Sequence, residues 1–203
     1  MNAMNILVTV DAKYAPHVRT LLKSLFSNNP GEAFHIYLIH DDLDRRDLDA
    51  LEAFCANHQS LFIPILLDDR LFDEAPVKAY YTRAMYYRLL AAHILPEELD
   101  KALYLDPDIL VINPVRPLYD LNMENSLFAA ASHAGLTKMV TMINRVRLGN
   151  FQAEAYFNAG VLLLHLNLQR SHIRRDEIFG YMNANRRKLI LPDQDVLNGL
   201  YWD

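Results

Sequence analysis

Short apolar runs alternate along the first third of the chain with stretches in which apolar residues recur at helical spacing. Residues 6–10, 34–39 and 61–67 are apolar runs of strand length, rich in β-branched residues, and they predict strands. Residues 14–26 and 44–57 carry apolar side chains every three or four positions, which predicts two helices. This alternation favours an α/β fold with a mostly parallel, Rossmann-like sheet flanked by helices and right-handed crossovers.

The rest of the chain has a less regular pattern. Two further strands are predicted at residues 103–111 and 126–131, and two helices at residues 79–95 and 168–185. Residues 136–148 are ambiguous, with a helix as one interpretation. Near the end of the chain we expect three features: a polar, small-residue break at 157–160, a strand at 161–166, and a last helical stretch at 196–200 opened by residues 193–195.

Composition fits one domain with a sizeable core. The chain has 203 residues, is 52% hydrophobic and carries a net charge of -5 with acids and bases interspersed, so it does not resemble a basic nucleic-acid-binding surface. The single cysteine, Cys55, excludes an internal disulfide framework and suits a reducing compartment; we expect it to be a small core residue. No apolar run reaches the roughly 20 residues of a membrane span, and no signal peptide is evident, which predicts a cytoplasmic location.

Two acids interrupt the apolar run at residues 103–111. Asp106 and Asp108 flank Pro107, which blocks a further ladder hydrogen bond and predicts that the strand ends there. Carboxylates at the carboxyl end of an α/β strand lie where such sheets bind ligands. A buried charge needs a partner, and a divalent cation such as Mg²⁺ or Mn²⁺ suits oxygen ligands. The alternative is a strand end with two solvated acids at a turn.

Other polar residues stand at comparable positions. Asp11 follows the first predicted strand and is either a ligand for a base or ribose or a helix cap. Tyr14 either stacks on a base or packs on its helix. Arg88 lies about two turns after Tyr81 on one helix face and either binds a pyrophosphate or an acid, or extends to solvent. Helix capping alone would also explain the acids in residues 193–195.

Familiar motifs for other chemistries are missing from the sequence. Neither G-x-G-x-x-G nor the phosphate-cradling G-x-x-x-x-G-K-[ST] pattern occurs, so a bound nucleotide would need a metal and basic side chains to hold its phosphates. The eight histidines form no H-x-x-x-H or H-E-x-x-H pair, which argues against zinc. There is also no G-x-S-x-G elbow for a serine nucleophile.

Taken together, the segments resemble glycosyltransferase family 8, the retaining enzymes that include glycogenin and the bacterial lipopolysaccharide galactosyl- and glucosyltransferases. Any one segment is weak evidence, but their order and spacing along almost the whole chain are specific. The resemblance implies a GT-A fold, a UDP-sugar donor (UDP-galactose or UDP-glucose), a manganese or magnesium ion, and transfer to a glycan or lipid-linked acceptor. The segments that carry it are residues 6–14, 86–89, 103–111, 156–161 and 193–199.

The resemblance also assigns roles at the nucleotide side. Asp106 and Asp108 look like the metal ligands of an Asp-x-Asp motif. Asp11 looks like the acid that contacts uracil, and Tyr14 like the ring that stacks on it. Lys13 stands where close relatives have an asparagine that contacts the donor ribose, so we expect ribose contacts to differ.

At the sugar side, Arg88 resembles the arginine that holds the donor, and Asn158 and Ala159 resemble donor-sugar contacts. Asp193 is expected to bind sugar hydroxyls, with Gln194 near the reacting face. Because an amide is a poor nucleophile, we favour a front-face transfer, in which the acceptor attacks on the side from which the leaving group departs. A sugar adduct trapped on Gln194 or Asp193 would contradict this hypothesis.

Two further departures from the family pattern bear on activity. An acidic acceptor-site residue of close relatives aligns near His133, which leaves the acceptor open. Family members also place a third metal ligand in a His-x-x-Gly-x-x-Lys-Pro-Trp motif beyond the Asp-Gln-Asp segment, and this chain stops before it. We therefore expect residues 1–203 to be a single GT-A domain truncated at its C-terminus, with weak donor binding, poor transfer, and any peripheral attachment to the inner membrane face supplied by the missing end.

Two alternatives remain at this stage. A haloacid-dehalogenase-like phosphatase also uses an Asp-x-Asp after an apolar strand, but it usually has that motif near the N-terminus with Thr or Val where this chain has Leu110. The second alternative is a non-catalytic domain that binds UDP-sugar.

Overall fold

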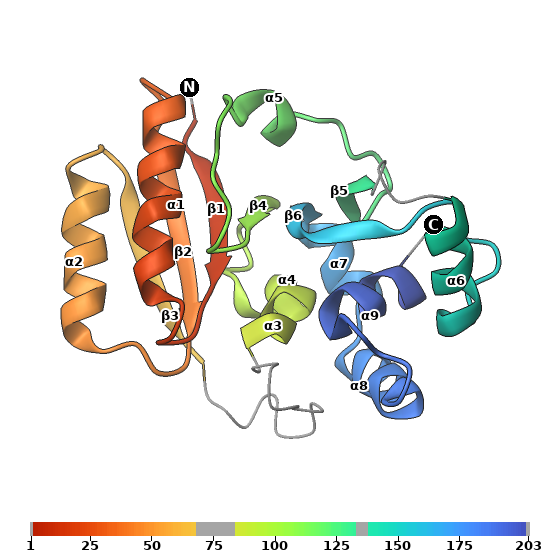
Figure 1. The fold of residues 1–203 in the computed structure, drawn as a ribbon. Helices are drawn as coiled ribbons and strands as arrows, with labels where there is room; N and C mark the ends of the chain where they lie inside the picture. The colour runs from red at the N-terminus through yellow and green to blue at the C-terminus, as the bar shows by residue number, and fades with distance from the viewer. Residues whose placement is uncertain (1, 68–83, 133–137, 202–203) are drawn as a thin grey trace.

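The computed structural model describes residues 2–67, 84–132 and 138–201, and in these ranges the chain forms a six-stranded sheet with helices on both faces (Figure 1). The strand order is β3-β2-β1-β4-β6-β5. The strands are β1 (Met4–Thr9), β2 (Phe34–His40), β3 (Leu61–Leu66), β4 (Lys101–Leu105), β5 (Phe128–Ser132) and β6 (Phe157–His165).

The sheet is parallel in one half and antiparallel in the other. The strands β3, β2, β1 and β4 pair in parallel, as the strand-helix alternation predicted. The last two strands differ, because β6 runs antiparallel to β4 and β5 runs antiparallel to β6. The predicted Rossmann-like, mostly parallel sheet is confirmed, with the antiparallel pairs confined to β6 and its two neighbours. The first three strands are each followed by a crossover, whereas β5 and β6 are not part of a βαβ repeat.

Alternation along the strands divides the apolar residues between two cores. Ile6 and Val8 of β1 pack in the core beneath α1 and α2, whereas Leu7 between them faces the opposite core. On the first face lie α1 (Ala15–Asn28), α2 (Arg45–Ala56) and α5 (Arg116–Tyr119). On the second lie α3 (Ala84–Tyr87), α4 (Ala91–Ile94), α7 (Leu166–His172), α8 (Arg175–Asn185) and α9 (Pro192–Leu200), with α6 (Lys138–Leu148) reaching this core through Leu148.

Local signals explain where the first two crossover helices begin. Asp44 caps α2 by accepting a hydrogen bond from the backbone N–H of Asp47 at 2.8 Å. Pro16 lies in the first turn of α1, where a missing backbone N–H has no consequence. Cys55 is fully buried, which confirms the prediction of a small core residue, and burial raises the pKa of its thiol to about 12.

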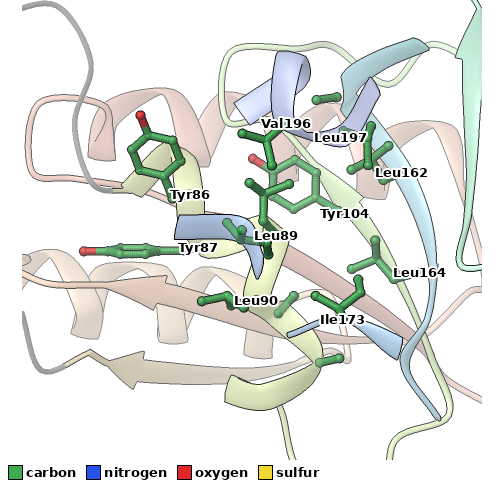
Figure 2. Close-up of a cluster of buried hydrophobic side chains, with 14 of the residues drawn as sticks. Tyr86, Tyr87, Leu89, Leu90, Tyr104, Leu162, Leu164, Ile173, Val196 and Leu197 are labelled. Atoms are coloured by element: carbon green, nitrogen blue, oxygen red, sulfur yellow. The ribbon is translucent and has the colours of Figure 1, made fainter. Parts of the chain in front are cut away.

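The predicted helix at residues 79–95 is broken in the structure. Residues 79–83, which include Tyr81, lie outside the described residues; the remainder forms α3, a 3-10 segment at Arg88–Leu90, and α4. Residues 86–92 are all buried, so the segment is surrounded by core on every side rather than amphipathic. In Figure 2, Leu89 of this segment lies in one cluster with Tyr104 of β4 and Val196 of α9.

Two other boundaries differ from the predictions. Residues 157–160 are the first part of β6 rather than a break, because Phe157 pairs with Ser132 of β5 and Gly160 accepts from the backbone N–H of Asp106. The side chain of Asn198 also bonds both the N–H and the carbonyl oxygen of Phe157. The predicted helix at residues 168–185 is two helices, because Ile173 is extended between them, buried, and bonded through its carbonyl oxygen to Nε2 of His93 at 2.8 Å. Residues 136–148 are resolved in favour of a helix from Lys138 onward.

The paired acids follow β4 as expected. This strand begins at Lys101 and ends at Leu105, directly before Asp106 and Pro107. A backbone bond from Ile109 to Asp106 closes the turn at an N···O distance of 3.4 Å. Among the described residues, no helix combines the length and the apolar character needed to cross a membrane.

Candidate active site

Arg88 lies at the centre of the candidate site. Its Nη2 is 2.8 Å from Oδ1 of Asp106, and its Nη1 is 3.3 Å from Oδ2 of Asp193. Nη1 also donates to the carbonyl oxygen of Ala159 at 3.0 Å. The guanidinium carbon lies 4.5 Å from the centre of the Tyr104 ring. One buried cation therefore joins the carboxyl end of β4, the start of β6 and the first turn of α9.

Burial sets the electrostatics of this cluster. The Arg88 side chain is only 8% exposed, and the burial that lowers its pKa is outweighed by the nearby Tyr104, Asp193 and Asp106, so its pKa is raised and it stays charged. Burial raises the pKa of Asp193, Arg88 opposes that shift, and the negative charge of Asp106 adds to it. Asp193 is therefore an acid that holds its proton more tightly than a solvated carboxylate.

Tyr104 is a site residue that the sequence interpretation missed. Its hydroxyl donates to Oδ1 of Asp106 at 2.5 Å and lies 3.2 Å from Oγ1 of Thr9 at the end of β1. Burial raises the pKa of Tyr104 well above its usual range, so the phenol remains a donor. Its position near the end of β4, two residues before Asp106, is the signal that was available, because residues i and i+2 of an extended chain share a face.

The lack of a side chain at Gly160 leaves room for the carboxylate of Asp106. A Cβ at this position would lie 2.8 Å from Oδ2 of Asp106 and 3.0 Å from Oδ1 of Asn158. The backbone of Gly160 also accepts from the N–H of Asp106 at 2.8 Å, and its own N–H donates to Oδ1 of Asn158 at 2.7 Å. The close approach of β6 to the end of β4 therefore requires a residue without a side chain.

Gln194 connects α9 to the first residues of β6. Its Oε1 accepts from the backbone N–H of Ala159 at 3.1 Å. Asn198, one turn later on α9, donates from Nδ2 to the carbonyl oxygens of Gln194 and Phe157, both at 2.8 Å. The structure thus places Asn158, Ala159 and Gln194 beside the Arg88 cluster. The family resemblance gave these three residues as contacts of the donor sugar, which stays a prediction.

The two acids of the Asp-Gln-Asp segment point to different partners. Asp193 faces Arg88 and does not cap the helix. Asp195 lies inside α9 and accepts from the backbone N–H groups of Ile190 and Leu191, which directly precede the helix; the N-cap residue is Leu191, so neither acid is the helix cap considered from the sequence.

Asp11, Lys13 and Tyr14 lie after β1, at the same edge of the sheet as Asp106, but their recorded contacts are local. Oδ1 of Asp11 accepts from the backbone N–H of Tyr14 at 3.1 Å, which forms a local turn ahead of α1; the N-cap residue is Tyr14, so Asp11 is not the helix cap considered from the sequence. Tyr14 is 39% exposed, and Nζ of Lys13 lies 5.8 Å from the centre of its ring. Within the described residues, no contact joins these three side chains to the Arg88 cluster.

Asp108 is exposed and Asp106 is partly buried, so both carboxylates are at least partly accessible to solvent. Arg88 and Tyr104 both bind Oδ1 of Asp106, which leaves Oδ2 for another ligand. No group of three metal-ligating side chains occurs in the part of the chain that the structure describes. Two carboxylates still fit a magnesium or manganese ion that completes its coordination with phosphate oxygens and water. His133, the residue expected near the acceptor, lies outside the described residues.

Comparison with known proteins identifies the family. The family model described as Glycosyl transferase family 8 matches residues 5–203. The chain belongs to glycosyltransferase family 8. This membership confirms the resemblance found in the sequence and favours it over a haloacid-dehalogenase-like phosphatase.

Relatives of this family 8 chain include general stress protein A of Bacillus subtilis, which is 24% identical over 98% of the chain and 70% of that protein. The lipopolysaccharide 1,2-glucosyltransferase of Escherichia coli is 25% identical over 97% of the chain and 58% of that protein. The crystal structure of galactosyltransferase LgtC in complex with donor and acceptor sugar analogues superposes with a TM-score of 0.88, at 25% identity, over 98% of this chain and 70% of that one. The superposition supports the GT-A fold, and the chain spans less than two thirds of some of its relatives.

Proposed function

We propose that this protein transfers a hexose, galactose or glucose, from a UDP-sugar to a glycan or lipid-linked acceptor with retention of anomeric configuration. The Arg88 cluster is the observation that carries the proposal. It places a permanent cation and two acids from separate segments at the carboxyl edge of the sheet, where α/β folds bind their ligands. Relatives named as glucosyl- and galactosyltransferases support the same substrate class.

In this proposal Asp106 and Asp108 hold a divalent cation, which when bound supplies Lewis-acid stabilisation of the diphosphate leaving group. The free Oδ2 of Asp106 and the exposed Asp108 are suitable ligands. The protein's own contribution is to fix one of these ligands before the donor arrives. Tyr104 and Arg88 hold Asp106 from one side, so that the carboxylate is oriented in advance.

Asp193 and Gln194 are proposed to hold the donor sugar against Ala159 and Asn158. Gln194 already accepts a hydrogen bond through Oε1, and an amide oxygen is a poor nucleophile. The buried Asp193 is paired with Arg88 rather than held free for attack. Both observations favour a front-face transfer over a covalent sugar intermediate.

The nucleoside is proposed to lie beside β1, with Asp11 contacting uracil, Tyr14 stacking on it, and Lys13 near the ribose. The exposed ring of Tyr14 is available for stacking, which every base accepts through its π-face. Attachment to the inner membrane face and a cytoplasmic location stay predictions.

A thermal-shift panel tests the proposal. UDP, UDP-galactose and UDP-glucose are added with and without Mn²⁺, and UDP release is measured with each sugar. We expect the melting temperature to rise by about 5–10 °C when a ligand is present at roughly 100 times its Kd with metal. The Asp106→Asn variant should lose this shift. Asp120→Asn is the matched control and should keep it, because Asp120 is an exposed acid directly after α5, which lies at the opposite end of the sheet (Figure 1).

Three other results would each redirect the proposal. A UDP-dependent shift without release or transfer of sugar would favour the non-catalytic binding domain. Hydrolysis of a generic phosphoester without dependence on UDP-sugar would favour phosphatase chemistry. A mass-shifted peptide carrying hexose on Gln194 or Asp193 would replace front-face transfer with a covalent mechanism.

A further inference from the structure

Asp195 differs from its neighbours because it is completely buried and accepts hydrogen bonds on both carboxylate oxygens. Nη2 of Arg147 and the hydroxyl of Tyr156 each lie 2.6 Å from Oδ1. Nη1 of Arg147 lies 2.7 Å from Oδ2, and the backbone N–H groups of Ile190 and Leu191 lie at 2.7 and 3.0 Å from the same atom. A carboxylate offers about four lone-pair sites, so these donors use its whole capacity.

A carboxylate in this state is not available to a substrate. Attack on a sugar, or acceptance of a proton from an acceptor hydroxyl, would require breaking charge-assisted bonds that are among the strongest in proteins. Asp195 nevertheless lies one residue after Gln194 and two after Asp193, in the same helical turn. Its effect on the site must therefore act through the backbone.

We propose that Arg147, Tyr156 and Asp195 form a positioning clamp, which fixes the first turn of α9 so that Asp193 reaches Arg88 and Gln194 reaches Ala159. The inference rests on the proposed transferase function for its catalytic consequence, and on geometry alone for its structural one. None of the three residues touches the reacting atoms, so they are positioning residues.

The clamp ties three separate parts of the chain together. Arg147 comes from α6, and its guanidinium also donates to the carbonyl oxygen of Lys188 at 2.6 Å and to Oδ1 of Asn144 at 3.0 Å. Tyr156 directly precedes β6, the strand that carries Asn158 and Ala159. The same carboxylate therefore fixes α9 relative to both α6 and the start of β6. A rigid support of this kind is what a catalytic pair on a helix end needs.

Arg147→Lys tests the clamp, because a lysine keeps the charge but cannot form the two-pronged pair. Arg116→Lys is the matched control: Arg116 pairs with Glu32 through both Nε and Nη2 at the far end of the sheet, beside Asn2. With the purified protein below the melting temperature of both variants, we expect Arg147→Lys to lower kcat by about 10- to 100-fold with a donor KM within about threefold. Arg116→Lys should leave both constants unchanged.

Hydrogen exchange provides a readout that does not depend on activity. In Arg147→Lys the amides of Ile190 and Leu191, which donate to Asp195, should exchange faster, and so should the amide of Ala159, which donates to Gln194. Amides of β1 should keep their protection. Tyr156→Phe removes one donor without changing the packing and should give a smaller change in the same amides.

The outcomes separate the clamp from the proposed function. If the unaltered protein releases no UDP from any UDP-sugar, the proposed function is wrong. Hydrogen exchange at the Ala159 amide in Arg147→Lys still shows whether the clamp holds Gln194. If exchange accelerates at Ile190 and Leu191 but kcat is unchanged, the cluster is merely structural and the positioning role is wrong. Unchanged exchange at all three amides would overturn the clamp itself.

Discussion

Arg88 is buried and Arg147 is partly buried, and each pairs with one acid of the Asp-Gln-Asp segment, but the two acids differ in how fully they are hydrogen-bonded. Arg88 binds Asp193 through one contact at 3.3 Å and shares Asp106, whose second oxygen stays free of it. Arg147 binds Asp195 through both oxygens, and other donors use what capacity remains. In the Arg88 cluster, Oδ2 of Asp106 is still available to a ligand, whereas in the Arg147 cluster both oxygens of Asp195 are fully hydrogen-bonded.

The difference shows that burial alone does not identify the residues that bind substrate. Asp193 and Asp195 are both almost inaccessible. Burial raises the pKa of Asp193, because a single arginine compensates only part of the lost hydration. An acid with spare capacity beside a permanent cation can respond to a ligand, whereas a saturated acid supports the fold. We expect substitutions in the Arg88 cluster to remove activity, and substitutions at Arg147 to reduce it through geometry.

The largest effect is expected for Arg88→Met, which keeps the apolar stem and removes the charge. Asp106 and Asp193 would lose their common cation, and an unpaired buried charge destabilises a protein by about 3–5 kcal/mol. Donor turnover should fall by roughly 1,000-fold or more, because the proposed donor contact and both acid orientations are lost together. Urea unfolding and UDP release measure the two effects. If Arg88→Met unfolds like the unaltered protein, the ion-pair account is wrong.

A smaller effect is expected for Gly160→Ala. The new methyl group would lie 2.8 Å from Oδ2 of Asp106, so the carboxylate must move. We expect turnover to fall by about 100-fold and stability by about 1–3 kcal/mol. Gly180→Ala is the matched control, since a Cβ there meets no atom within 4 Å and alanine suits a helix better. Equal turnover in the two variants would contradict the role given to Gly160.

A smaller effect than that of Gly160→Ala is expected for Tyr14→Ala, which removes the exposed ring proposed to stack on uracil. Stacking on an aromatic side chain is worth about 1–3 kcal/mol, so the donor KM should rise by roughly tenfold while kcat changes little. Tyr14→Phe keeps the ring and should behave like the unaltered protein. Steady-state kinetics on both variants decide the point, and an unchanged KM for Tyr14→Ala would place the base elsewhere.

The smallest effect is a dependence of stability on pH from Asp193. Its pKa is raised above the ordinary value of 3.8, so the folded protein holds this proton more tightly than the unfolded chain. The contribution of Asp193 to stability is therefore present at low pH and decreases as the pH rises through the raised pKa. Between pH 3.8 and the raised pKa, the unfolding free energy of the unaltered protein should fall with rising pH relative to that of Asp193→Asn. If it instead rises relative to Asp193→Asn over this range, the direction given for the pKa shift is wrong.

Sequence patterns predicted the parallel half of the fold better than the site half. β1, β2, α1 and α2 are repeating units whose apolar spacing is set by one sheet face and one helix stripe, so periodicity finds them. In the other half, tertiary contacts override the pattern. Ile173 leaves the helix because His93 binds its carbonyl oxygen.

The site itself was predicted only in part. Asp106 and Arg88 were candidates from the residue pattern, each with an alternative, and the family resemblance added expected roles for Asp193 and Gln194. The structure brings these four residues together, and their roles stay predictions. Their supporting residues were missed. Tyr104 reads as one more apolar residue in a buried strand until its hydroxyl is placed beside Asp106. Arg147 carries no local signal, because its partner Asp195 is 48 residues away in sequence.

Calorimetric titration of UDP in the presence of Mn²⁺, on Asp106→Asn and Arg147→Lys side by side, tests the distinction between the two clusters most directly. If the Arg88 cluster holds the donor and the Arg147 cluster only supports it, UDP binding disappears in Asp106→Asn and persists in Arg147→Lys with nearly the affinity of the unaltered protein. Loss of binding in Arg147→Lys together with retained binding in Asp106→Asn would contradict the account.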